Sequence, residues 1–145
     1  MKNNPGVTLI EILLVIATMT VLAGLSIPIY QSLQLKNSLD VAAVEVVQTM
    51  RRAQVLAQAS SGDVTWGVAI RDNKITLFQG GSYALRNDDF DEVFDLPSSI
   101  TPLGLQEIVF DKFDGLPQIT GTLELSTESK EIRNISINEK GTILY

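Results

Sequence analysis

The residue with the sharpest chemical implication in this sequence is Glu11, a carboxylate inside an apolar run that covers residues 7–27. A helix of that length spans roughly 31 Å, which matches the hydrocarbon thickness of a bilayer. A lone charge at that depth costs on the order of 3 kcal/mol. No basic side chain lies within the run. Glu11 therefore requires a proton or a cationic partner from outside its own helix.

Other chemistry has few candidates, because the 145-residue chain contains no His and no Cys. Their absence removes the commonest general base, thiol nucleophiles, disulfides and thiolate metal sites. Carboxylates gather in one stretch, and oxygen ligands of this kind suit Ca²⁺, but the Gly and closing Glu of an EF-hand loop are missing. The acidic residues are Asp88, Asp89, Asp91, Glu92 and Asp95. We expect a solvated acidic loop, no metal or other cofactor, no catalytic residues and no enzyme.

The net charge of −6 argues against a general affinity for nucleic acid or anionic lipid, which favour a basic face. Arg51 and Arg52 form the only adjacent basic pair. Lys130, Arg133 and Lys140 lie near the C-terminus, each beside acidic residues. The sequence therefore lacks a basic run that would predict a nucleic-acid partner.

The apolar run allows three interpretations. It could be a membrane anchor in which Glu11 is incidental. It could be a secretory signal peptide cut between Ala23 and Gly24, although the run exceeds the usual 7–15 residues of such peptides. It could also follow a short leader, residues 1–6, that is removed in front of the run. In the first and third interpretations the positive leader stays in the cytoplasm and the remaining chain crosses.

The third interpretation is favoured by a resemblance. Gly6-Val7-Thr8-Leu9-Ile10-Glu11 is similar to the type III signal of type IV prepilins, in which Gly precedes an apolar residue and T-L-I-E. The resemblance implies cleavage between Gly6 and Val7 by a prepilin peptidase and N-methylation of Val7. It implies that Glu11 meets the new amine of a neighbouring subunit during assembly. Val7 departs from the commoner Phe, and Pro28 matches a proline that bends or loosens the pilin helix.

A helical stripe follows Pro28. Apolar residues recur at spacings of three and four: Leu35, Leu39, Ala42, Val46, Met50, Ala53 and Ala57. This period predicts an amphipathic helix whose apolar face packs against a core, and the helix is expected to extend from Val7 to Ala59. A coiled-coil partner is the minor alternative for this stripe.

The remaining sequence has the pattern of β-strands. Residues 64–70 and 75–78 predict a hairpin, with Trp66 in the core, followed by a polar loop through Asp89. Further strands are expected near residues 92–96, 107–110, 120–127, 132–138 and 142–145. The fold class is α+β and pilin-like: a long N-terminal helix, membrane-spanning in its first half, packed on an antiparallel sheet. The expected segments are a leader (1–6), a membrane or filament-core helix (7–29), an amphipathic half-helix (30–62) and a β-rich head (63–145).

The second half also resembles the H-type pseudopilins of type II secretion, the FimT-like minor pilins and the D-type competence pseudopilins. The similar segments include Trp66-Gly67-Val68 and Gly115-Leu116-Pro117. The resemblance implies a minor pilin or pseudopilin, held by one span in the inner (cytoplasmic) membrane with its head outside the cytoplasm. It would assemble with other pilin or pseudopilin subunits into a type IV pilus or a type II secretion pseudopilus. The alternative is a FimT-like minor pilin that binds DNA for uptake.

Overall fold

The computed structural model describes residues 6–59 and 63–145, apart from the side chains of residues 25–32. The chain divides into two compact units, Met1–Gln34 and Leu35–Tyr145. From here on, "the head" means the whole second unit, which includes the C-terminal part of the helix as well as the β-rich residues 63–145. One helix, α1 (Leu9–Gln58), supplies residues to both units. Its ends lie within two residues of the helix expected from the sequence. Within the described residues, no helix combines the length and apolarity needed to cross a membrane.

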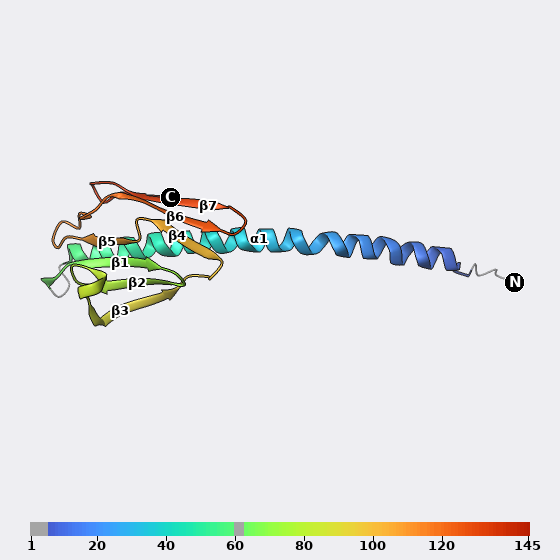
Figure 1. Cartoon of the computed structure of the whole chain (residues 1–145), viewed down its shortest axis with the longest axis horizontal. Helices are drawn as coiled ribbons and strands as arrows, with labels where there is room; N and C mark the ends of the chain where they lie inside the picture. Colours follow the sequence, from blue (N-terminus) through green and yellow to red (C-terminus); the bar gives the residue numbers. More distant parts are fainter. Residues whose placement is uncertain (1–5, 60–62) are drawn as a thin grey trace. The chain divides into compact units, whose positions relative to one another are not determined.

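The head contains two antiparallel sheets of four strands, shown in Figure 1. The first has the order β3-β2-β1-β5 and the second the order β4-β6-β7-β8. Their bounds are β1 Trp66–Arg71, β2 Lys74–Gln79, β3 Asn87–Asp95, β4 Ile100–Gly104, β5 Glu107–Phe110, β6 Gly121–Thr127, β7 Ile132–Ile137 and β8 Ile143–Leu144, with a short 3-10 helix, η2, at Tyr83–Leu85. The α+β class is thus confirmed, with two sheets in place of the single sheet expected.

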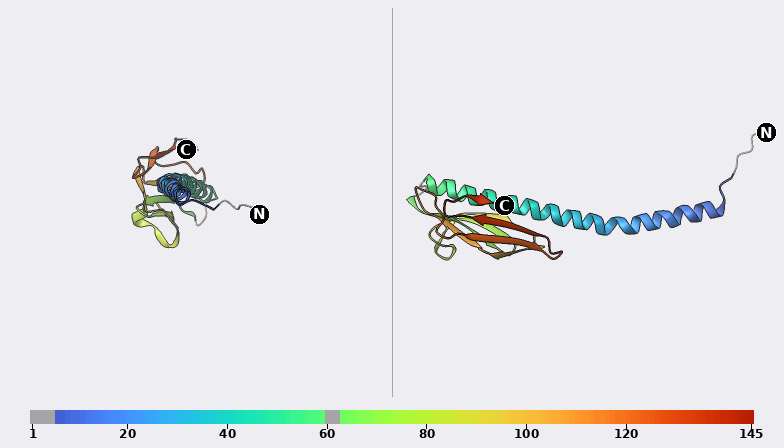
Figure 2. Two further views of the ribbon diagram at one scale, coloured as in Figure 1. Left: turned by 90° about the vertical axis from the view of Figure 1, so that its right-hand side faces the viewer. Right: turned by 90° about the horizontal axis from the view of Figure 1, so that it is seen from above.

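The C-terminal half of α1 forms the centre of the head core. Figures 1 and 2 show strands of both sheets lying along this part of the helix. The predicted apolar stripe is confirmed, because all its members except the half-buried Leu35 are buried. They share one cluster with inward-facing residues of both sheets, including Trp66, Leu77 and Ile135. The stripe is therefore covered by this chain's own strands and not by a coiled-coil partner.

The two sheets meet where β4 continues into β5. Gly104 ends β4 with φ +80°, a conformation that other residues rarely adopt, and a Cβ there would lie 2.5 Å from the Thr122 carbonyl oxygen. Leu105 N–H then donates to that oxygen at 3.0 Å, and Ile70 N–H donates to the Gln106 carbonyl at 2.7 Å. The chain therefore passes from one sheet to the other at Gly104, which forms the corner between the two sheets.

The strand expected near residues 92–96 is confirmed but begins earlier, at Asn87, so the expected acidic loop through Asp89 is wrong. The acidic residues belong to β3, which lies at the outer edge of its sheet. The pairing with β2 shifts register, because Leu77 pairs with Glu92 while Gln79 pairs with Asn87. A bulged and charged edge strand resists pairing with another chain. The carboxylates are tolerated in a strand because most of them face solvent at this edge.

Candidate functional site

The first candidate site is the start of α1, where Gly6, Val7 and Thr8 precede the helix and are exposed. Thr8 and Glu11 form a capping box. The Thr8 backbone N–H donates to Glu11 Oε2 at 2.8 Å, the Thr8 hydroxyl donates to the same oxygen at 2.7 Å, and Glu11 N–H donates to Thr8 Oγ1 at 3.4 Å. This arrangement satisfies donors that a helix start leaves free, so it fixes the first turn directly after the Gly6–Val7 bond.

The helix that follows exposes apolar side chains on every face. The large apolar residues exposed here are Val7, Leu9, Ile10, Ile12, Leu13, Leu14, Val15, Ile16, Met19, Val21 and Leu22. The Thr18 hydroxyl donates to the Val15 carbonyl at 2.9 Å, and the Thr20 hydroxyl donates to the Ile16 carbonyl at 2.8 Å. The polar groups of the threonines are thus paired within the helix. A helix that is apolar on all sides is stable when lipid or other helices surround it.

Pro28 was predicted to bend or loosen the helix. Its side chain lies outside the described residues, so that role stays a prediction. Gly6, Val7 and Glu11 are described and lie at the same helix end, where Glu11 accepts a hydrogen bond from the Thr8 N–H.

Some charged residues of the head form ion pairs between its helix and strands. Arg52 pairs with Glu92 at 2.7 Å and links α1 to β3, while Arg133 pairs with Asp40 at 2.7 Å and links β7 to α1. In the described part of the chain, no group of three or more acidic residues is placed to hold a metal ion. The ion pairs are therefore structural contacts between the helix and the strands.

A cluster that the sequence did not indicate surrounds Tyr83 on the outer face of the β3-β2-β1-β5 sheet. Its ring meets Phe78 edge-on at 5.8 Å, and the Arg86 guanidinium lies 4.0 Å from the ring centroid. A hydrogen bond from Lys74 lowers the Tyr83 pKa below its usual value of 10; burial opposes this shift and the Arg86 charge adds to it. The Asp91 carboxylate, 2.7 Å from Arg86 Nε, raises the Arg86 pKa.

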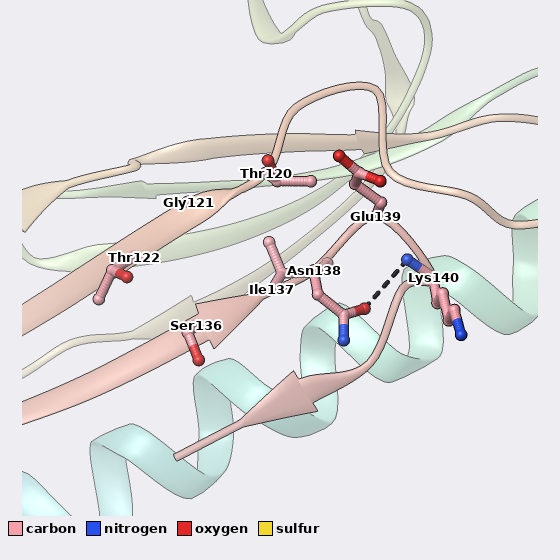
Figure 3. Close-up of a pocket in the computed structure, with 8 residues that line it drawn as sticks. All are labelled: Thr120, Gly121, Thr122, Ser136, Ile137, Asn138, Glu139 and Lys140. Carbon is pink, nitrogen blue, oxygen red and sulfur yellow. Dashed lines mark hydrogen bonds between the residues drawn. The ribbon is translucent and has the colours of Figure 1, made fainter.

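Open depressions on the surface of the head include two lined by described residues. The one in Figure 3, of about 600 Å³, lies at the ends of β6 and β7 and is lined by Thr120, Gly121, Thr122, Ser136, Ile137, Asn138, Glu139 and Lys140. Its Asn138 side chain accepts hydrogen bonds from the backbone N–H groups of Lys140 and Thr142, both at 3.0 Å. This amide thus shapes the turn. The second depression, of about 570 Å³, adjoins β5, and its lining includes Arg71, Ser82, Glu107 and Val109.

Two glutamines of α1 donate hydrogen bonds to backbone carbonyls in two turns of the head. Gln54 Nε2 donates to the carbonyls of Gly115 and Gly141, at 3.1 and 3.3 Å, and Gln58 Nε2 donates to the carbonyl of Asp114 at 3.1 Å. No local pattern predicts these contacts, because polar residues of a helix usually face solvent. No protein-family model, curated protein or solved structure matches this chain.

Proposed function

We propose that the chain is a pilin-like subunit, a minor pilin or pseudopilin that is cut after Gly6 and packs residues 7–29 into the core of a filament. The observation that carries the proposal is the all-round apolar start of α1, which directly follows an exposed Gly6–Val7 bond. In the cell, this helix would first cross the inner membrane, since residues 7–27 provide roughly 31 Å of apolar length. The head would lie outside the cytoplasm.

Cleavage after Gly6 would create a cationic group that can pair with the Glu11 carboxylate. Cleavage by a prepilin peptidase would leave an α-amino group on Val7, with a pKa of about 7.7–8.0 in water and hence a positive charge at neutral pH. The hydrogen bonds from Thr8 use one carboxylate oxygen, Oε2, so that, among the described residues, Oε1 is available for a second donor. A methylated Val7 amine of a neighbouring subunit would offset the buried charge, since two opposite buried charges cost less together than apart.

The test is the substitution Glu11→Ala in the native host. We expect membrane insertion to be unchanged, because the apolar run becomes more apolar, while recovery of the subunit in sheared filaments falls at least tenfold. Glu45→Ala, on the head half of the same helix, is the matched control and should assemble normally. Normal filament recovery for Glu11→Ala would end the pairing mechanism.

DNA binding is the weaker proposal, because the net charge of −6 disfavours it. Arg52 and Arg133 are each paired with a carboxylate. A gel shift with the purified chain at rising salt should detect no complex, and a steep salt dependence of a complex would reverse this ranking.

A further inference from the structure

A short segment, which we call the strap, folds over the outer face of the β3-β2-β1-β5 sheet. It consists of residues 80–86, which connect β2 to β3 and include η2. Its two ends are fixed, because Gln79 and Asn87 pair with each other across the two strands. Gly80 has φ +142°, and a Cβ on the exposed Gly81 would meet open space, so the backbone at the start of the strap is unusually free to turn. The strap can therefore move while the strands that it connects stay paired.

The strap covers a small apolar cluster that is separate from the head core. The cluster consists of Ala69, Phe78 and Val109, with Tyr83 of the strap packed against it. None of the three residues of η2 is buried. Segments with few buried apolar contacts open locally at a lower free energy than the whole domain. The packing of the strap is thus weak, and its polar contacts decide how firmly it is held.

Two carboxylates of the sheet hold the strap. Glu107 Oε1, on β5, accepts a hydrogen bond from the Tyr83 N–H at 2.9 Å. Asp91 Oδ2, on β3, accepts one from Arg86 Nε at 2.7 Å, and Asp88 Oδ1 lies 3.2 Å from the same nitrogen. Hydrogen bonds to a charged group are roughly twice as strong as neutral ones. The attachment of the strap therefore depends on negative charge in the sheet.

The closed strap also brings three cations together. The Arg86 guanidinium lies 4.0 Å from the centroid of the Tyr83 ring, and those of the sheet residues Arg71 and Lys74 lie 5.6 and 6.0 Å from it through their charged groups. Carboxylates offset these charges: Asp88 and Asp91 pair with Arg86, Glu107 pairs with Arg71, and Asp95 lies opposite Lys74 across β2 and β3. Acid protonates carboxylates and leaves guanidinium and ammonium groups charged. Closure would then place like charges side by side without a counter-charge.

We propose that the strap is released by acid: residues 80–86 lift from the sheet when Glu107 and Asp91 lose their charge, while the head core stays folded. Opening exposes the apolar cluster of Ala69, Phe78 and Val109. The inference concerns the head alone and does not depend on assembly into a filament.

The absence of native Cys allows a single thiol to report the opening. Ala69→Cys places the thiol under the strap, and Ala53→Cys, the matched control, places it in the head core; both alanines are 0% exposed. The full-length chains in detergent are treated with dithiodipyridine, and each rate is divided by that of the same chain unfolded in urea at the same pH. We expect Ala69→Cys to react at least tenfold faster than Ala53→Cys at pH 7. This ratio should rise at least threefold at pH 4.

Each result bears on one part of the inference. Equal rates for the two chains at both pH values would show that Ala69 is reached only when the whole head unfolds, and would overturn the strap. A ratio that does not rise in acid would overturn release by the carboxylates. Val109→Cys is a second reporter from the same cluster and should show the same rise, so the test does not depend on the folding of one variant.

A charge variant tests the role of Glu107 directly. Glu107→Gln keeps an acceptor for the Tyr83 N–H but has no charge to pair with Arg71. Added to both cysteine chains, it should raise the ratio at pH 7 at least threefold and reduce the further rise at pH 4. Glu124→Gln is the control, because Glu124 is a partly buried glutamate on β6 of the other sheet, and it should leave the ratio unchanged. An equal effect of the two substitutions would show that net charge alone controls the opening and would overturn the inference.

Discussion

Replacing Gln54 with Ala should loosen two turns at once, those that contain Gly115 and Gly141. The Gln54 amide donates to the carbonyls of Gly115 and Gly141 from a partly buried position on α1. A neutral hydrogen bond contributes about 0.5–1.5 kcal/mol net, so the loss of two should lower the free energy of unfolding by about 1–3 kcal/mol. Gly141 has φ +74° and packs so closely on Gln54 that a Cβ at position 141 would overlap its amide nitrogen.

Two further glutamines on the same helix provide a graded control. Gln58 donates one such bond, to the Asp114 carbonyl at 3.1 Å, and Gln58→Ala should cost about half as much. Gln48 is exposed and donates no hydrogen bond among the described residues, so Gln48→Ala should change the free energy of unfolding by no more than about 0.5 kcal/mol. Urea denaturation followed by Trp66 fluorescence measures all three in the full-length chain.

The test is the order of the three losses in the free energy of unfolding, which should be largest for Gln54→Ala and smallest for Gln48→Ala. If Gln54→Ala is no more destabilising than Gln48→Ala, the hydrogen bonds of Gln54 to Gly115 and Gly141 do not stabilise the two turns.

The remaining predictions concern the core and the Tyr83 cluster. Gly67→Ala should destabilise the head by about 1–3 kcal/mol in urea, because the new Cβ would lie 2.5 Å from Cζ of Phe78. Met50→Ala, at a buried site, should cost about 2–5 kcal/mol in the same assay, and a smaller cost would mean that the core collapses to fill the space. Because the Tyr83 pKa is lower in the folded chain than its usual value of 10, its ionised form adds stability as pH rises through the folded pKa towards 10, and this contribution is lost as pH falls through the folded pKa. An alkaline absorbance titration should therefore show one tyrosine ionising first, and Tyr83→Phe should remove that step.

The helix and most strands could be predicted because their patterns are local. The stripe that includes Leu39, Val46 and Met50 has the helical period, and all three side chains are buried. The hairpin of β1 and β2 was also predicted, with a turn in which Asn73 takes φ +66°. Asn tolerates this conformation, and the turn lies between two β-like runs.

The strand β4 was missed because Pro97 precedes it and Pro102 interrupts its sequence. Proline cannot donate to a sheet ladder and is confined to edges, and β4 is an edge strand in which Pro102 lies opposite Leu125. The division into two sheets depends on Gly104 and its contact with Thr122, which are far apart in sequence. Such contacts leave no periodic signal.

In the candidate sites, too, local patterns could be predicted from the sequence and long-range contacts could not. The Thr8–Glu11 capping box lies within one helical turn and is visible in the sequence as a T-x-x-E pattern. The Tyr83 cluster and the exposed Phe113 depend on partners brought together by the fold. Nothing in the local sequence singles out Phe113 for a left-handed conformation, since the neighbouring Gly115 is the more obvious candidate.

The most direct test of the central claim is to determine the N-terminal residue and its modification by mass spectrometry of the chain purified from membranes of its native host. The account predicts a chain that begins at Val7 and carries an N-methyl group. A chain that begins at Gly24 would contradict it and indicate a signal peptide, and an uncut Met1 would leave a simple membrane anchor.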